Sequence, residues 1–95
     1  LIHMAKGLAR QHAATGIRVN TVSPGMVYFE GGIWHTVKTN MPEFFEQANA
    51  RNPMGRCATP QEIANAAVFL ASPLSSYTTG ANLIVDGAVS NRVNF

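Results

Sequence analysis

The stretch GIRVNTVSPGMVYF, residues 16–29, contains an apolar segment that stops abruptly at a turn. Residues 17–22 are rich in β-branched side chains, which predicts a strand, and their apolar character fits burial on both faces in a parallel sheet. Ser23-Pro24-Gly25 should end that strand, because proline has no N–H for a sheet ladder. Ligands of open α/β sheets bind beyond the carboxyl ends of strands, so we expect a binding site at this turn. The alternative is an ordinary turn that only ends a strand.

Helical patterns flank the strand. Apolar residues recur at helical spacing over residues 1–14, and Thr15-Gly16 provides a stop signal. No capping residue precedes Leu1, so we expect this helix to begin earlier, in a longer chain. Residues 23–34 hold three Gly and a Pro and are predicted to form a loop, and a further helix is expected to start at Pro42.

The clearest local signal in the second half is a capping box. Thr59 is the expected N-cap, Pro60 takes the first helical position, and Glu62 is the partner three residues after the cap. Residues 81–85 predict a second short strand, closed by a turn at Asp86-Gly87. Two strands joined through helices form a βαβ-like unit, but two parallel strands cannot cover their own faces and edges. We therefore expect an α/β fold with more strands than these 95 residues supply.

The composition narrows the class of protein and the kinds of partner that are possible. Hydrophobic residues make up 46% and charged residues 13%, which is typical of one small globular domain whose surface is partly covered by something else. A net charge of +2 without a Lys/Arg cluster argues against a nucleic-acid partner, and no apolar run approaches the ~18 residues of a membrane span. The single Cys57 excludes an internal disulfide framework, and His3, His12 and His35 lack zinc-site spacing. We expect a cytoplasmic protein without a metal site.

Two segments, IRVNTVSPG and RCATPQEIANAAVFLASPLSSYTTGANLIVDG, together resemble the C-terminal part of a short-chain dehydrogenase/reductase. The resemblance covers about residues 1–88 and is weakest at residues 28–51. It implies the C-terminal portion of a Rossmann-type doubly wound parallel sheet that binds NAD or NADP. The family's glycine-rich phosphate loop, catalytic Ser and Tyr-x-x-x-Lys pair do not occur in these 95 residues. We therefore expect residues 1–95 to be a C-terminal fragment of one dinucleotide-binding domain, with no catalytic residue of its own.

The resemblance also implies two groups of site residues. The turn expected to pack against the nicotinamide, with the backbone at Val27 meeting its carboxamide, consists of Pro24, Gly25, Met26 and Val27. A mobile apolar substrate lid on a Gly31-Gly32 hinge is expected to contain Tyr28, Phe29, Ile33 and Trp34. The alternative for this second group is a local hydrophobic cluster under a long loop. Phe29 stands where many relatives place a cofactor-binding Thr, and it cannot form that hydroxyl hydrogen bond.

Two functions remain open at this stage. The first is the C-terminal segment of an NAD(P)-dependent oxidoreductase that interconverts an alcohol and a carbonyl. Its partners would be the missing N-terminal part of the same fold, a small-molecule carbonyl or alcohol substrate, and further copies in a homodimer or homotetramer. Gly7 lies among small residues in the first helix, which predicts a close helix contact between copies. The second function is a non-catalytic truncated remnant that acts only as a binding or assembly module.

Overall fold

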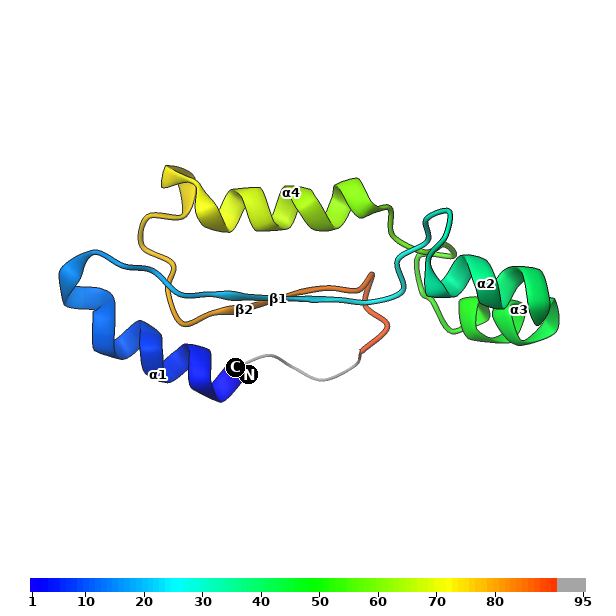
Figure 1. Cartoon of the computed structure of the whole chain (residues 1–95), viewed down its shortest axis with the longest axis horizontal. Coiled ribbons are helices and arrows are strands. Elements are labelled where there is room, and N and C mark those ends of the chain that lie inside the picture. Colours follow the sequence, from blue (N-terminus) through cyan, green and yellow to red (C-terminus); the bar gives the residue numbers. More distant parts are fainter. Residues whose placement is uncertain (91–95) are drawn as a thin grey trace.

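A computed structural model describes residues 1–90 of the chain as a thin arrangement of helices around a short sheet (Figure 1). The elements follow in the order α1 (Ile2–His12), η1 (Ala13–Thr15), β1 (Thr21–Pro24), α2 (Ile33–Asn40), α3 (Pro42–Ala50), α4 (Pro60–Ala71), η2 (Pro73–Ser75) and β2 (Asn82–Val85), where η marks a 3₁₀ turn.

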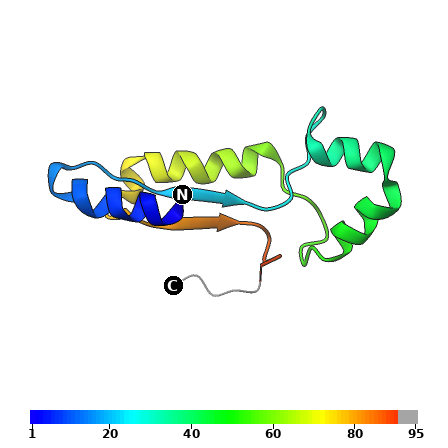
Figure 2. The same cartoon turned by 60° about the horizontal axis from the view of Figure 1, so that its bottom comes forward.

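The two strands lie side by side and run parallel, from the pair Thr21 and Asn82 to the pair Pro24 and Val85. Helix α4 packs on one side of the sheet and α1 lies on the opposite side (Figures 1 and 2). The hairpin of α2 and α3 lies beyond the carboxyl ends of both strands. The predicted α/β class with parallel strands is confirmed.

The predicted bounds of the first strand are wrong. β1 spans Thr21–Pro24 rather than residues 17–22, because a ladder forms only where β2 runs alongside. Val19 bonds instead to the loop before β2, accepting from the Gly80 N–H at 2.7 Å. The N–H groups of Thr21 and Gly25 donate across to β2, to the carbonyls of residues 81 and 85, so the nitrogen of Pro24 points away from that strand. A proline is tolerated inside β1 for this reason, so the prediction that Ser23 and Pro24 would end the strand is wrong.

Short sequence signals correctly predicted where α3 and α4 begin. The capping box at Thr59 and Glu62 is present, with Pro60 in the first turn of α4, and α3 starts at Pro42 as expected. The predicted loop over residues 23–34 is wrong at its end, because α2 begins at Ile33. Two glycines precede α2, and they masked the helical spacing of the eight residues that follow.

Arg18, just before β1, joins the sheet to the far end of α4. Its guanidinium donates to the carbonyls of Leu70 at 2.8 Å, Ser72 at 3.1 Å and Thr78 at 3.2 Å, and to the hydroxyl of Ser75 at 3.0 Å. Helix C-termini carry unpaired carbonyls and a partial negative charge. Arg18 therefore caps α4 from a distant part of the chain.

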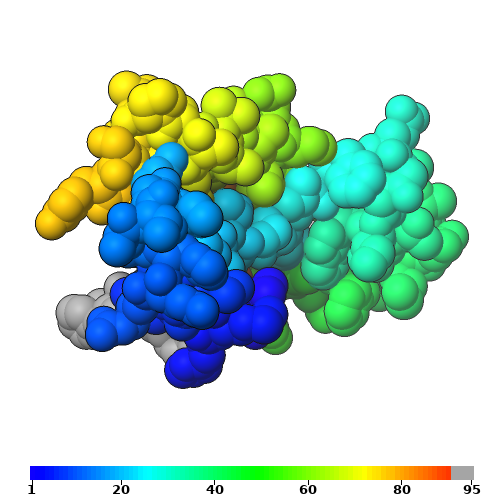
Figure 3. Space-filling model, turned by 60° about the vertical axis from the view of Figure 1, so that its left-hand side comes forward, coloured from blue at the N-terminus to red at the C-terminus, as the bar shows by residue number. Residues whose placement is uncertain are grey.

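The described elements do not enclose a core. Only Ala5, Ala9 and Leu70 are buried apolar residues among residues 1–90. The chain exposes 7054 Å² of accessible surface, whereas a compact chain of its mass exposes about 5,300 Å². In Figure 3, α1 (blue) and α4 (yellow to green) form separate ridges. A groove of about 330 Å³ between α1 and β1 is lined mainly by apolar side chains: Leu1, Met4, Ala5, Leu8, Val19 and Val22.

Candidate functional site

The turn predicted to meet the nicotinamide leaves β1 and is held by two different segments. Gly25 donates its N–H to the Val85 carbonyl at 3.0 Å, which is the last contact with β2. The chain then pairs with the loop before α4: the Met26 carbonyl accepts from the Ala58 N–H at 2.8 Å, and the Tyr28 N–H donates to the Ala58 carbonyl at 3.0 Å. The turn is thus fixed both to the sheet and to the start of α4.

Val27 lies between those two hydrogen bonds, and its own polar groups face the other way. In a parallel bridge, the residue between the two bonded groups directs its N–H and C=O away from the partner. Within residues 1–90, neither the N–H nor the C=O of Val27 has a hydrogen-bond partner. One donor and one acceptor therefore stand together at the carboxyl end of the sheet. A primary carboxamide, which carries one C=O and one NH₂, matches such a pair.

Gly25 lies close to the segment that follows β2. A side chain there would meet Asp86, whose Cβ lies 2.7 Å from the position of an added Cβ, rather than open space beside the turn. Gly25 is also not among the residues with positive φ. The close neighbour of Gly25 within this chain is therefore Asp86, directly after β2, which no local pattern around residue 25 could indicate.

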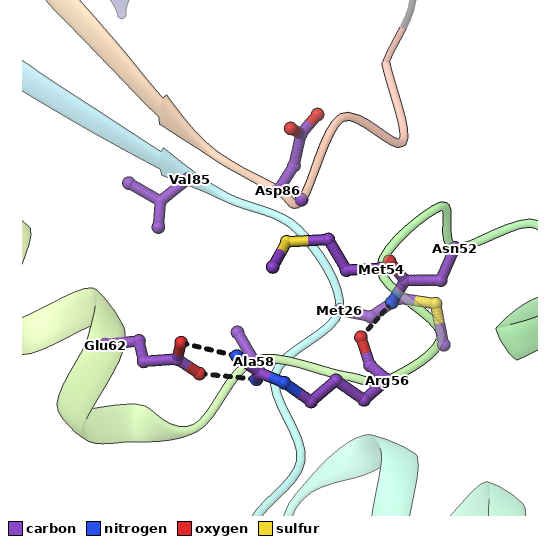
Figure 4. A pocket seen from close by; sticks show the side chains of 9 residues that line it. Met26, Asn52, Met54, Arg56, Ala58, Glu62, Val85 and Asp86 are labelled. Carbon is purple, nitrogen blue, oxygen red and sulfur yellow. Dashed lines mark hydrogen bonds and ion pairs between the residues drawn. The ribbon is translucent and has the colours of Figure 1, made fainter.

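The loop that supports the turn, residues 52–58, is organised by polar contacts (Figure 4). Arg56 makes a bidentate ion pair with Glu62, at 2.7 and 2.9 Å, and donates to the Cys57 carbonyl at 3.1 Å. The hydrogen bond from Arg56, followed by the one from the Thr59 N–H, lowers the pKa of Glu62 to about 2. Asn52 is only 6% exposed, and its side-chain amide donates to the Arg56 carbonyl.

A cavity of about 100 Å³ lies between this loop and the ends of the strands. Its walls include Met26 from the turn, Met54 from the loop, Val85 at the end of β2 and Asp86 directly after it (Figure 4). The buried Oδ1 atom of Asn52, another wall residue, has no hydrogen-bond partner among the described residues. No sequence pattern pointed to Arg56 or Asn52. Only the capping box at Glu62 gave a signal nearby, and it does not indicate an arginine six residues earlier.

The residues predicted to form a lid separate into two groups. Tyr28 and Trp34 belong to a cluster of aromatic rings: the ring of Tyr28 lies 6.0 Å from those of His35 and Phe45, and Trp34 lies 6.4 Å from Phe45. The ammonium of Lys38 stands 5.3 Å from the Tyr28 ring and 5.6 Å from the Phe45 ring, within cation–π range. These side chains hold the α2–α3 hairpin together, and the lid role of Tyr28 and Trp34 stays a prediction.

Phe29 and Ile33 lie outside that cluster and are 49% and 77% exposed. Ile33 and Trp34 are on helix α2, so the prediction that both lie in a flexible loop is wrong. Gly31 has a φ of +84°, whereas Gly32 is buried against the ring of Phe29, which leaves no room for a Cβ. Ring and glycine therefore pack together in an ordered turn that leads into α2.

Three further features of the described residues concern a metal site, a membrane-spanning helix and a reactive thiol. Residues 1–90 contain no group of three His, Cys, Asp or Glu side chains that could hold a metal ion. None of their helices has the length and apolar character needed to cross a bilayer. Partial burial raises the pKa of the Cys57 thiol, which opposes formation of a reactive thiolate at neutral pH.

Comparison with known proteins identifies the family. A family model described as Enoyl-(Acyl carrier protein) reductase matches residues 1–90. An oxidoreductase of the short-chain dehydrogenase/reductase family from Burkholderia thailandensis has a similar structure, with a TM-score of 0.81 and 40% identity, over 93% of this chain and 34% of that one. The chain belongs to the short-chain dehydrogenase/reductase family. Its sheet and helices are the C-terminal portion of a Rossmann-type doubly wound parallel sheet, as the resemblance implied.

Two further relatives are similar over most of this short-chain dehydrogenase/reductase segment. Isoepoxydon dehydrogenase patN of Aspergillus clavatus is 50% identical over 80 residues, which are 84% of this chain and 31% of that protein. A putative 2-deoxy-D-gluconate 3-dehydrogenase from Agrobacterium tumefaciens, solved with bound NADP, is 35% identical with a TM-score of 0.83, over 96% of this chain and 36% of that one. The chain thus spans about a third of the length of the relatives it matches.

Proposed function

We propose that this chain is the C-terminal segment of an NAD(P)-dependent oxidoreductase that interconverts an alcohol and a carbonyl. Its part is to hold the nicotinamide end of the dinucleotide at the turn of Pro24, Gly25, Met26 and Val27. The observation that carries the proposal is the unpaired N–H and C=O of Val27 at the carboxyl end of β1. A carboxamide bound there would fix the orientation of the nicotinamide ring. When bound, the dinucleotide supplies or accepts the hydride.

We assign a second role, which is to cover the substrate, to the lid residues Tyr28, Phe29, Ile33 and Trp34. The exposed side chains of Phe29 and Ile33 offer apolar contact, and the aromatic cluster around Tyr28 keeps the hairpin in place. An apolar cover excludes water from a reacting centre and strengthens its electrostatic interactions. The relatives support this class of reaction, because one is named a dehydrogenase and another was solved with NADP.

The rest of the same fold is proposed to cover the exposed apolar surface. The groove between α1 and β1, and the excess of accessible surface, fit a chain that forms one domain only together with an N-terminal part. That part would supply the phosphate loop and the proton-transferring Ser, Tyr and Lys. We further propose a cytoplasmic homodimer or homotetramer with α1 in the contact. Among residues 1–90, nothing lies within 4 Å of the position of a Cβ added to Gly7, which leaves space there for another helix.

Two experiments test the proposal. The first determines the roughly 20 residues encoded before Leu1, where a Tyr-x-x-x-Lys sequence is expected by similarity to the family. The second assays the intact protein for oxidation of NADH and NADPH with a panel of carbonyl compounds. Turnover by the intact protein is expected. A start codon directly before Leu1, or an intact protein that neither binds nor oxidises either dinucleotide, would favour the non-catalytic assembly module.

A further inference from the structure

The backbone of Val27 is held by hydrogen bonds at two points, one before it and one after it, called the upstream and the downstream anchor. The upstream anchor is the sheet itself, through the hydrogen bond from Gly25 to Val85. The downstream anchor is Ala58, which carries both hydrogen bonds that flank Val27. Ala58 belongs to no helix and to no sheet beyond this single bridge. Its position must therefore be set by the loop around it.

Arg56 closes that loop onto helix α4. The bidentate pair with Glu62 joins both ends of the seven residues 56–62, and the same guanidinium donates to the Cys57 carbonyl inside them. Glu62 is itself fixed in the first turn of α4 by the Thr59 N–H, at 2.9 Å. Since α4 packs on both strands, the chain of contacts runs from the sheet through α4 and Arg56 to Ala58.

The exposure of the pair argues that its main effect is geometric. The side chains of Arg56 and Glu62 are 52% and 40% exposed. Ion pairs at such positions add little to folding stability, because water and salt screen them. Bidentate arginine–carboxylate pairs nevertheless restrict geometry strongly, since two parallel hydrogen bonds fix the relative orientation of both groups. Asn52 adds a second restraint by donating to the Arg56 carbonyl from a buried position.

We propose that Arg56 is a positioning residue for nicotinamide binding: through its pair with Glu62 it fixes Ala58, and through Ala58 it fixes the N–H and C=O of Val27. This inference rests on the function proposed above. Arg56 does not touch the dinucleotide in this account. Its removal loosens only the downstream anchor of the turn, while the anchor at Val85 and the sheet remain.

The test compares three variants of the intact protein that disturb the same helix start: Arg56→Met, its conservative counterpart Arg56→Lys, and Thr59→Ala. Arg56→Met removes the bidentate pair and leaves Glu62 bonded to the Thr59 N–H. Thr59→Ala removes the hydroxyl that accepts from the Glu62 N–H at 3.2 Å and leaves the Arg56 pair intact, so it is a matched control for loss of the cap. Dissociation constants are measured for NAD(P)H and for ADP-ribose, which lacks the nicotinamide, together with thermal unfolding midpoints.

We expect Arg56→Met to raise the dissociation constant for NAD(P)H about tenfold and to leave that for ADP-ribose within twofold. Arg56→Lys, which can keep one hydrogen bond to Glu62, should show an intermediate increase. Thr59→Ala should lower the unfolding midpoint without this selective change. Equal weakening of both ligands by Arg56→Met, or no weakening, overturns the inference while the proposed function stands. Failure of the wild-type protein to bind NAD(P)H overturns the proposed function itself.

Discussion

Replacing Arg18 by methionine in the intact protein should destabilise it severely, although Arg18 lies far from the candidate site. The guanidinium donates to three carbonyls and one hydroxyl where α4 ends and η2 begins. No carboxylate takes part in these contacts, so the arginine acts as a helix cap rather than as half of an ion pair. Methionine keeps much of the length of the side chain and removes every donor.

The magnitude follows from the number of bonds and their exposure. A hydrogen bond from a charged donor contributes about 1.5–3 kcal/mol. Four acceptors share one group, such contributions are not additive, and water can reach part of this site, so we expect a total loss of about 3–4 kcal/mol. For a domain of the relatives' size, that loss corresponds to a decrease in the unfolding midpoint of about 10 °C. Arg18→Lys keeps the charge near the helix end and should lose about half as much free energy.

Urea unfolding followed by circular dichroism measures this loss directly. Arg51→Met is the matched control, because Arg51 is an exposed arginine just after α3 and away from α1, and a surface change of this kind stays within about 0.5 kcal/mol of wild type. If Arg18→Met is no less stable than Arg51→Met, the contacts of Arg18 do not hold α4 to the sheet. The structural account of that end of the fold would then be refuted.

Four further predictions concern other parts of the chain. The isolated 95-residue chain should neither oxidise NAD(P)H nor bind it with micromolar affinity, because the phosphate-binding loop and the acid–base residues are missing; turnover or a micromolar calorimetric titration would contradict this. Ala88→Gly should stabilise the intact protein by about 0.5–1 kcal/mol, because Ala88 has a φ of +70°, and thermal unfolding measures the gain. The pKa of Glu62 is lowered to about 2 from an ordinary 4.5, so the pair adds stability above pH 4.5, small because water and salt screen it, that is lost as the pH falls toward 2; the stability difference between wild type and Glu62→Gln should shrink slightly over that interval and stay constant above it. Gly7→Leu should reduce the oligomeric state seen by light scattering, and an unchanged mass and stability would exclude Gly7 from a tight interface.

Local chemistry determined the parts of the fold that could be predicted. The capping box at Thr59 and Glu62 and the proline at residue 42 act within a few residues, and both helices begin where those signals stand. The bounds of β1 could not be predicted from residues 17–22 alone. They depend on where β2, about 60 residues later, runs alongside.

The candidate site, like the fold, could be predicted only where local sequence signals determine it. The approximate end of β1 was recognisable from sequence, but the predicted turn was not placed correctly, because Pro24 belongs to β1 and Gly25 still bonds to Val85. The residues that hold this segment could not be predicted. Asp86 lies against Gly25 across a separation of 61 residues, and Ala58 pairs beside Val27 across 31. Such contacts depend on tertiary packing, which leaves no periodic pattern. Residues 23–34 were predicted to form a loop because they hold three Gly and a Pro, whereas α2 begins at Ile33, Gly31 lies in a turn and Gly32 packs under the ring of Phe29.

The central claim is that the backbone of Val27 binds the nicotinamide carboxamide. A crystal structure of the intact protein with NAD(P)H tests it most directly. The account predicts that the carboxamide oxygen accepts from the Val27 N–H, and that the carboxamide NH₂ donates to the Val27 carbonyl, each at about 2.7–3.2 Å. A bound dinucleotide whose carboxamide lies away from Val27, with the Val27 backbone paired to another part of the protein, would contradict the claim.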